Sequence, residues 1–234
     1  MNSPFNTYQM PVIEASEGVA AFESIESLKV LCAQALDQKM ADLLQQKAQL
    51  ELENRELRRL ANTDELTQVA NRRFFDQQLQ QEWQRLRRDR QVCSLILLDI
   101  DYFKRYNDFY GHQAGDSCLM QIAKAIQGAV KRPADFVARY GGEEFAIVLP
   151  NTCTAGALAV AERVQQAIEA QKISHEQSDI SQFVTVSMGV SSLMPTVEGC
   201  VEMLIARADA ALYTAKQLGR KRYYPYLDSV ELES

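Results

Sequence analysis

The 234-residue sequence has no long apolar segment and no excess of positive charge. No apolar run approaches the length that a membrane span needs, and the start lacks the basic and then apolar pattern of a secretory signal. We therefore predict a cytoplasmic protein that has no membrane partner. The net charge of −6 and the pI near 5.1 argue against a broad nucleic-acid-binding surface, so no nucleic acid is expected as a partner.

Cysteine pairs at metal-binding spacing are also missing. The number of cysteines is odd, and none stands in a CxxC motif, which is typical of reduced thiols rather than of disulfides or a zinc site. The 47% hydrophobic and 24% charged content is ordinary for a soluble globular protein. The length allows one substantial domain and an appendage. The cysteines are Cys32, Cys93, Cys118, Cys153 and Cys200.

Residues 25–61 contain neither glycine nor proline, and leucine recurs in them every seven residues. With the leucines at heptad position d, Asn54 falls at position a, where it favours a dimer and fixes its register. We predict a coiled-coil dimerisation helix over residues 25–61; the alternative is a single amphipathic helix that lies on its own domain. Residues 1–24 show no clear period, and we expect them to be irregular. The d leucines are Leu36, Leu43, Leu50 and Leu57, and the other a residues are Met40, Lys47 and Ala61.

Two glycines and two glutamates stand between two strand-like runs, residues 135–140 and 145–149. A glycine pair there predicts a tight hairpin turn with positive φ at both Gly141 and Gly142. Backbone without Cβ can approach a phosphate closely, and adjacent carboxylates can hold a hard cation. The alternative is a solvated hairpin with an acidic edge.

A second acidic group follows the apolar run 93–98. The continuous apolar character predicts a strand covered on both faces, and Asp99 and Asp101 should point to the same side of it. Together with the hairpin, these carboxylates indicate a site for a nucleotide and Mg²⁺. The alternative is that Asp101 caps a helix beginning at Tyr102, with Asp99 as its solvated neighbour.

These two segments, RYGGEEF at residues 139–145 and DIDYFKRYND at residues 99–108, resemble the GGDEF family of diguanylate cyclases in its GGEEF variant. The resemblance covers residues 62–226 and leaves residues 227–234 as a tail. It includes the opening motifs at residues 64–67 and 71–73, although Gln-Val-Ala replaces the usual Gly-Leu-Pro between them. We expect that replacement to make the helix that restarts near Asn62 more continuous.

The resemblance implies a fold and a reaction. The fold would be α/β (α+β), a cyclase- or polymerase-palm-like sandwich whose mainly antiparallel sheet is flanked by helices, preceded by the coiled coil. The reaction would join two GTP molecules into cyclic di-GMP with loss of two pyrophosphates, using Mg²⁺ (or Mn²⁺) in a homodimer. Asp99, Glu143 and Glu144 match the catalytic residues. Asp99, Glu143 and the carbonyl of Ile100 match the metal ligands.

The substrate residues are likewise implied by the resemblance. Asn107 and Asp116 match the guanine readers, because guanine offers N–H donors that a carboxylate can accept. Lys216 and Arg220 are four residues apart, so we expect them on one helical face, reaching one triphosphate. Outside the motif, these four would be ordinary helix-surface residues. The other predicted substrate-binding residues are Phe103, Lys104, Gly141 and Gly142.

Arg132 and Asp135 form an RxxD motif upstream of the hairpin, where the family carries its product-inhibition site. An arginine fork can grip a guanine edge or a phosphate. We therefore predict inhibition by cyclic di-GMP through these two residues. The alternative is that Arg132 favours the dipole of a helix end, with Pro133 ending the helix.

Three rival functions remain. The first is a catalytically silent module that binds GTP or cyclic di-GMP, against which the intact Asp99, Glu143 and Glu144 argue. The second is an enzyme that makes adenine or mixed cyclic dinucleotides, against which Asp116 argues. The third is a coiled-coil scaffold without nucleotide dependence.

Overall fold

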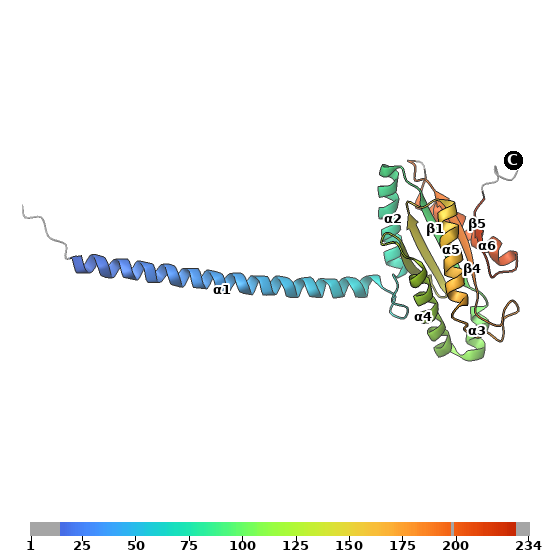
Figure 1. Cartoon of the computed structure of the whole chain (residues 1–234), viewed down its shortest axis with the longest axis horizontal. Helices are drawn as coiled ribbons and strands as arrows, with labels where there is room; N and C mark the ends of the chain where they lie inside the picture. The colour runs from blue at the N-terminus through green and yellow to red at the C-terminus, as the bar shows by residue number, and fades with distance from the viewer. Residues whose placement is uncertain (1–14, 198, 228–234) are drawn as a thin grey trace, which may run out of the picture. The chain divides into compact units, whose positions relative to one another are not determined.

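The computed structural model describes residues 15–197 and 199–227 and divides into two units, Met1–Leu57 and Arg58–Ser234. Helix α1 (Ala15–Asn62) is one continuous helix of 48 residues (Figure 1). It begins ten residues before the predicted start at Ile25, so the expectation of irregular structure is wrong for residues 15–24. That stretch is rich in alanine and glutamate and has no proline, so it favours helix. The predictions for residues 1–14 and for the tail residues 228–234 lie outside the described residues.

The heptad leucines of α1 are exposed in the single chain, with exposed fractions between 50% and 66%. Charged side chains pair along the helix surface, as Lys47 does with Glu51 at 3.9 Å. An exposed pair of this kind contributes little to stability. Burial of the apolar row by a partner would therefore stabilise α1 more than the charged pairs do. No helix in the described part of the chain is both long and apolar enough to cross a bilayer.

The second unit is built on a five-stranded sheet in the order β2-β3-β1-β4-β5. Strand β1 (Cys93–Ile100) lies at its centre and pairs antiparallel with β3 (Glu144–Pro150) and β4 (Val186–Leu193). Strand β2 (Phe136–Gly141) pairs antiparallel with β3, and β5 (Tyr223–Pro225) runs parallel to β4. The prediction of a mainly antiparallel sheet is confirmed.

Helices cover both faces of this sheet. On one face lie α3 (Phe103–Tyr110), α4 (His112–Ala129) and α5 (Thr154–Glu169), and Figure 1 shows α4 and α5 side by side. The other face packs against α2 (Arg72–Asp89) and α6 (Val201–Gln217). The central sheet therefore separates two apolar clusters.

Strand β1 shows why its sequence is apolar without alternation. Ile96 and Leu98 belong to the cluster under α4 and α5, whereas Leu95 and Leu97 belong to the cluster under α2 and α6. These four side chains are at most 5% exposed. A strand buried on both faces needs apolar residues at every position. The prediction that this strand is covered on both sides is confirmed.

The segment between α1 and α2 is a turn and not the predicted continuation of a helix. The Asp64 side chain accepts hydrogen bonds from the backbone N–H of Thr67 at 2.9 Å and from its hydroxyl at 2.6 Å. Gln68 takes a positive φ of 57°, and Asn71 caps α2 by accepting the N–H of Phe74. Short polar side chains that bond to nearby backbone compete with helix, so α2 starts at Arg72.

Candidate active site

The carboxylates predicted to be catalytic meet at one edge of the sheet. Asp99 on β1 lies opposite Glu144 on β3 in the strand register. Lys216 of α6 places its Nζ 2.8 Å from Oδ2 of Asp99, and both side chains are largely buried. The structure therefore brings three of the predicted residues together and pairs Lys216 with the carboxylate of Asp99.

The electrostatics of this edge favour a cation. Burial raises the pKa of Asp99, Lys216 lowers it, and the charge of Glu143 raises it further. Burial also raises the pKa of Glu144, reinforced by Asp99 and opposed by Lys216. Several carboxylates thus share the field of one lysine. The negative charge of these carboxylates would therefore stabilise a further cation bound beside them.

The hairpin turn is centred one residue later than predicted. Gly142 has a positive φ of 53°, but Gly141 does not, because it is the last residue of β2 and pairs with Glu144. A bulge between Arg139 and Gly141 shifts the register. The two turn residues are therefore Gly142 and Glu143. This shift places Glu143 at the tip and Glu144 at the start of β3.

Arg139 ties this turn to the loop before α2. Its Nε donates to the carbonyl of Gly142 at 2.8 Å, and its guanidinium donates to both Asp64 oxygens at 3.1 and 3.3 Å. Both residues stand within the family motifs, but the motifs do not indicate that they pair. Their opposite charges were visible in the sequence, but 75 residues separate them. The ion pair between Arg139 and Asp64 forms only when the fold brings these two segments together.

Asp101 adds its charge to the carboxylate edge, where it raises the pKa of Asp99, but its own side chain is taken up by hydrogen bonds. It is 1% exposed and accepts hydrogen bonds from the hydroxyls of Thr185 (2.8 Å) and Ser187 (2.7 Å) and from the N–H of Lys221 (3.2 Å). It does not cap α3 either, because Tyr102 occupies the cap position and makes no side-chain cap. Strand β1 ends at Ile100, so strand alternation no longer applies to Asp101. Both sequence interpretations of Asp101 are wrong.

Beside the carboxylate edge lies a cavity of about 480 Å³ between α3, α4 and the hairpin turn. It collects most of the predicted substrate residues, but Gly141, Lys216 and Arg220 are not among its lining. Asp116 and Lys104 are exposed there, so their polar groups are accessible. The predicted residues that line it are Phe103, Lys104, Asn107, Asp116, Gly142 and Glu143.

Asn107 is the most informative residue of the cavity. Its Oδ1 is buried and has no hydrogen-bond partner among the described residues. A Cβ at position 115 would overlap this oxygen, so Gly115 leaves the room that the amide occupies. Buried polar atoms are nearly always satisfied, so this oxygen is free to accept a hydrogen bond from a molecule in the cavity. No motif in the sequence marks Gly115 for this role, because the contact depends on how α3 packs against α4.

Arg220 does not lie on the same helical face as Lys216. Helix α6 ends at Gln217, and Arg220 follows Gly219 with a positive φ of 61°. The guanidinium donates to the hydroxyl of Tyr102 at 3.3 Å. The prediction of a helical i, i+4 pair is therefore wrong, because Gly219 ends the helix before the second residue is reached.

The RxxD residues lie close together within the chain. Arg132 donates to the hydroxyl of Thr152 at 2.8 Å, and its NH1 lies 3.9 Å from Oδ1 of Asp135. Burial raises the pKa of Asp135, and Arg132 and Arg163 lower it. Oδ1 of Asp135 is buried and has no hydrogen-bond partner among the described residues. Asp135 thus has unused acceptor capacity beside an arginine.

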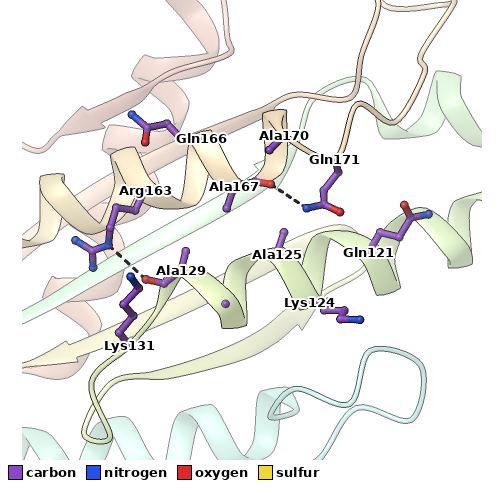
Figure 2. Close-up of a pocket in the computed structure, with 11 residues that line it drawn as sticks. Gln121, Lys124, Ala125, Ala129, Lys131, Arg163, Gln166, Ala167, Ala170 and Gln171 are labelled. Carbon is purple, nitrogen blue, oxygen red and sulfur yellow. Dashed lines mark hydrogen bonds between the residues drawn. The ribbon is translucent and has the colours of Figure 1, made fainter.

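Arg132 is not the residue that caps α4. The helix ends at Ala129, and the guanidinium Nε of Arg163 from α5 donates to the carbonyl of Ala129 at 3.4 Å (Figure 2). A cavity of about 720 Å³ opens between the two helices at this point. Arg163 therefore supplies a hydrogen bond at this helix end, whereas the described side-chain partners of Arg132 are Thr152 and Asp135.

The donor set for a cation is small. Among residues 15–197 and 199–227, no group of three or more histidine, cysteine, aspartate or glutamate side chains is arranged to hold a metal ion. Asp99 and Glu143 would supply two carboxylates, and Ile100, whose hydrocarbon side chain has no donor atom, could contribute only its backbone carbonyl. Oxygen donors of this kind suit Mg²⁺ or Mn²⁺ rather than a softer metal. The assignment of these ligands remains a prediction.

Comparisons with known proteins agree on one family. The sequence model described as "Diguanylate cyclase, GGDEF domain" matches residues 61–222. Diguanylate cyclase A of Treponema denticola is 38% identical over 178 residues, which are 75% of this chain and 47% of that protein. The response regulator PleD of Caulobacter vibrioides is 39% identical over 164 residues, 69% of this chain and 35% of that protein. The chain thus matches about half or less of these relatives.

Solved structures give the same result. The coiled coil and GGDEF domain of DgcB from Caulobacter crescentus, in complex with c-di-GMP, has a TM-score of 0.70 at 31% identity, covering 81% of this chain and 98% of that one. The active GGEEF domain of a diguanylate cyclase from Vibrio cholerae has a TM-score of 0.60 at 36% identity. The match covers 69% of this chain and 99% of that one.

Proposed function

Because the chain belongs to the diguanylate cyclase GGDEF-domain family, we propose that it condenses two GTP molecules into cyclic di-GMP in the cytoplasm. The observation that carries the proposal is the unpaired Oδ1 of Asn107 in a cavity beside the Asp99–Lys216 edge. A buried amide oxygen with free acceptor capacity and a group of carboxylates that favours a cation lie next to each other. A guanine nucleotide with its divalent cation would complete both.

Guanine fits the donors and acceptors of the cavity. Its N1–H and N2–H₂ groups can donate to Oδ1 of Asn107 and to the carboxylate of Asp116. The exposed position of Asp116 at the cavity rim lets it accept without the cost of a buried charge. Adenine lacks this pair of donors at its edge, so the same acceptors would stay unpaired. The site therefore favours GTP over ATP.

The phosphates would lie along the N-terminus of α3. That helix has neither a side-chain cap nor an acidic residue in its first turn, so its N–H groups near Phe103 and Lys104 are available to an anion. Gly142 offers backbone without Cβ on the opposite wall of the cavity. Lys216 and Arg220 approach from the C-terminal part of the chain. Both would bind phosphate oxygens at the edge.

Asp99, Glu143 and the carbonyl of Ile100 would hold Mg²⁺ or Mn²⁺. When bound, such an ion neutralises phosphate charge and lowers the pKa of a hydroxyl that attacks. The remaining chemistry belongs to side chains. Burial raises the pKa of Glu144, which suits a group that accepts the proton of the 3′-hydroxyl. That oxygen bonds to the α-phosphorus of the facing GTP, and the α–β phosphoanhydride bond breaks to release pyrophosphate.

Two sites must face each other, so the active form would be a homodimer. Each subunit binds one GTP, and the second bond closes the ring. The row of exposed leucines on α1 supports pairing of two copies through a coiled coil. Cyclic di-GMP would in turn inhibit by binding at Arg132 and Asp135. The half-exposed guanidinium and the unused carboxylate oxygen support that site.

The deciding experiment is incubation of the full chain with GTP and Mg²⁺, followed by mass spectrometry of the products. The expected result is cyclic di-GMP with two pyrophosphates for each product molecule. Omission of the metal and replacement of GTP by ATP are the controls, and both should give no cyclic dinucleotide. Binding of GTP or cyclic di-GMP without turnover would instead establish a silent binding module.

A further inference from the structure

The aromatic ring of Tyr102 is approached by two arginines from different parts of the chain. The guanidinium carbon of Arg220 lies 4.6 Å from the ring centroid, and that of Arg105 lies 4.5 Å from it. Arg220 also donates to the Tyr102 hydroxyl at 3.3 Å. A guanidinium over an aromatic face is held by the ring quadrupole, and the hydroxyl adds direction. Tyr102 therefore fixes the position of Arg220 by two contacts.

The two arginines differ in how their charge is balanced. Arg105 donates to Asp179 at 2.6 Å and is thereby neutralised. For Arg220, the described contacts are with the ring and hydroxyl of Tyr102, neither of which is charged. A guanidinium has five N–H donors, and the Tyr102 hydroxyl uses one of them. Arg220 thus keeps both its charge and most of its donors for an anion.

The backbone on both sides of this contact has an unusual conformation. Tyr102 has a φ of 57°, and Arg220 and Lys221 have φ values of 61° and 51°. Left-handed backbone at non-glycine residues is uncommon and persists where the surroundings fix it. On the Tyr102 side, its carbonyl accepts the N–H of Tyr106 at 3.1 Å. On the Arg220 side, the N–H of Lys221 donates to Asp101. Both ends of the contact are held by the fold.

We infer that Tyr102 is a positioning residue, which holds the Arg220 guanidinium beside the first turn of α3, where the triphosphate would lie. The inference rests on the proposed function, since it needs a phosphate for Arg220 to bind. Its physical basis is entropy. Arginine has many rotamers, and a side chain that is already held loses less freedom when the ligand arrives.

The test measures binding by isothermal titration with two probes, in the presence of Mg²⁺. The first is 3′-deoxy-GTP, which keeps the triphosphate but lacks the attacking hydroxyl and cannot turn over. The second is GMP, which lacks the β- and γ-phosphates. Tyr102→Leu should weaken 3′-deoxy-GTP binding by about threefold to tenfold, the range expected for a cation–π contact and its hydroxyl bond. GMP binding should change less than about twofold.

Three further variants separate positioning from a general structural role. Arg220→Ala should cause the largest loss of 3′-deoxy-GTP affinity. The double variant with Tyr102→Leu should bind 3′-deoxy-GTP no more weakly than Arg220→Ala alone. Tyr102→Phe keeps the ring, so it should lose less affinity for 3′-deoxy-GTP than Tyr102→Leu does. It also replaces Tyr102→Leu in the test if the leucine variant does not fold. Tyr213→Leu removes an exposed tyrosine of α6 and should bind both probes as wild type does.

Each other outcome overturns the inference in a recognisable way. If Tyr102→Leu weakens GMP as much as 3′-deoxy-GTP, Tyr102 only supports the fold of the site. If Tyr102→Leu and Tyr102→Phe both bind like wild type while Arg220→Ala is weak, Arg220 needs no positioning. If Arg220→Ala binds like wild type, Arg220 does not touch the phosphates. Failure of the proposed function is seen separately, as wild-type protein that binds 3′-deoxy-GTP but forms no cyclic di-GMP from GTP.

Discussion

Helices α1 and α2 have similar sequence patterns but opposite surroundings. The apolar positions of α2, Phe75, Leu79, Trp83 and Leu86, are at most 4% exposed, because they pack against the sheet and α6. The heptad leucines of α1 are at least half exposed. Periodicity alone therefore tells that a helix has an apolar face, and it does not tell what covers that face.

The different burial of these two apolar faces indicates what stabilises each part of the chain. The second unit buries its own core, so a change at its site should act equally at every protein concentration. If a second copy covers the leucines of helix α1, as we propose, their burial depends on pairing, so a change there should act mainly on dilution. The following predictions test this contrast, in order of decreasing effect.

Glu143→Gln should lower the turnover number by about 10²–10³-fold, the usual loss when a charge that stabilises the transition state is removed. The loss should be the same from nanomolar to micromolar protein, because the hairpin turn lies within the second unit. Pyrophosphate release measures it, with Glu162→Gln on the exposed side of α5 as the matched control. Near-normal turnover would show that this turn carries no cation.

Replacement of Leu43 and Leu50 by glutamine should lower specific activity about tenfold or more at low protein concentration, with partial recovery at high concentration. Both leucines lie at d positions, so the change removes apolar contacts from the dimer seam. The control is the double glutamine variant of Leu31 and Leu52, which are similarly exposed but fall at heptad position f, away from the seam. Sedimentation should accompany the assay. If the variant of Leu43 and Leu50 is monomeric and still has unchanged activity, activity does not depend on pairing through α1.

Arg132→Ala should raise the inhibitory concentration of cyclic di-GMP by at least about tenfold, which corresponds to 1.4 kcal/mol. The guanidinium supplies charge-assisted hydrogen bonds beside Asp135, and alanine supplies none. Progress curves with added cyclic di-GMP measure the shift, relative to the velocity before product accumulates. Lys131→Ala removes a neighbouring charge without the fork and is the control. Identical inhibition in wild type and Arg132→Ala would leave Arg132 with its bond to Thr152 alone.

His175 should make the second unit less stable in mild acid. Its ring is fully buried, against Tyr106 and near Arg105, and burial lowers its pKa, with a further lowering by Arg105. The carbonyl of Tyr102, which the ring contacts, acts in the opposite direction. The unfolded chain therefore binds a proton more readily than the folded chain. The contribution is present above about pH 6.5 and is lost as the pH falls below that value.

The measurement is urea unfolding at pH 7.5 and pH 5.5, followed by the fluorescence of Trp83, the single tryptophan. The free energy of unfolding should fall between the two by less than about 1.4 kcal/mol per pH unit, independently of protein concentration. His175→Gln should remove this part of the pH dependence. His112→Gln, at the exposed second histidine, should retain it. Equal pH dependence in all three proteins would contradict the assignment.

The sequence by itself determined the family, the mainly antiparallel sheet and the doubly buried β1. Each of these rests on order and local pattern: an apolar run of strand length, a glycine turn between two alternating segments, and motifs at fixed spacing. The carboxylates at Asp99, Glu143 and Glu144 followed from the same patterns, and the fold gathers Asp99 and Glu144 opposite each other. Their roles remain predictions.

The tertiary structure decided what depends on register and on long-range packing. One bulge in β2 moved the turn from Gly141 to Gly142 and Glu143. Hydrogen bonding to β4 took up the side chain of Asp101. The contact of the Asn107 amide with Gly115 joins two neighbouring helices, and the ring that holds Arg220 lies 118 residues before it in the chain. Sequence periodicity describes neighbours along one element, and it carries no information on which side chains of different elements meet.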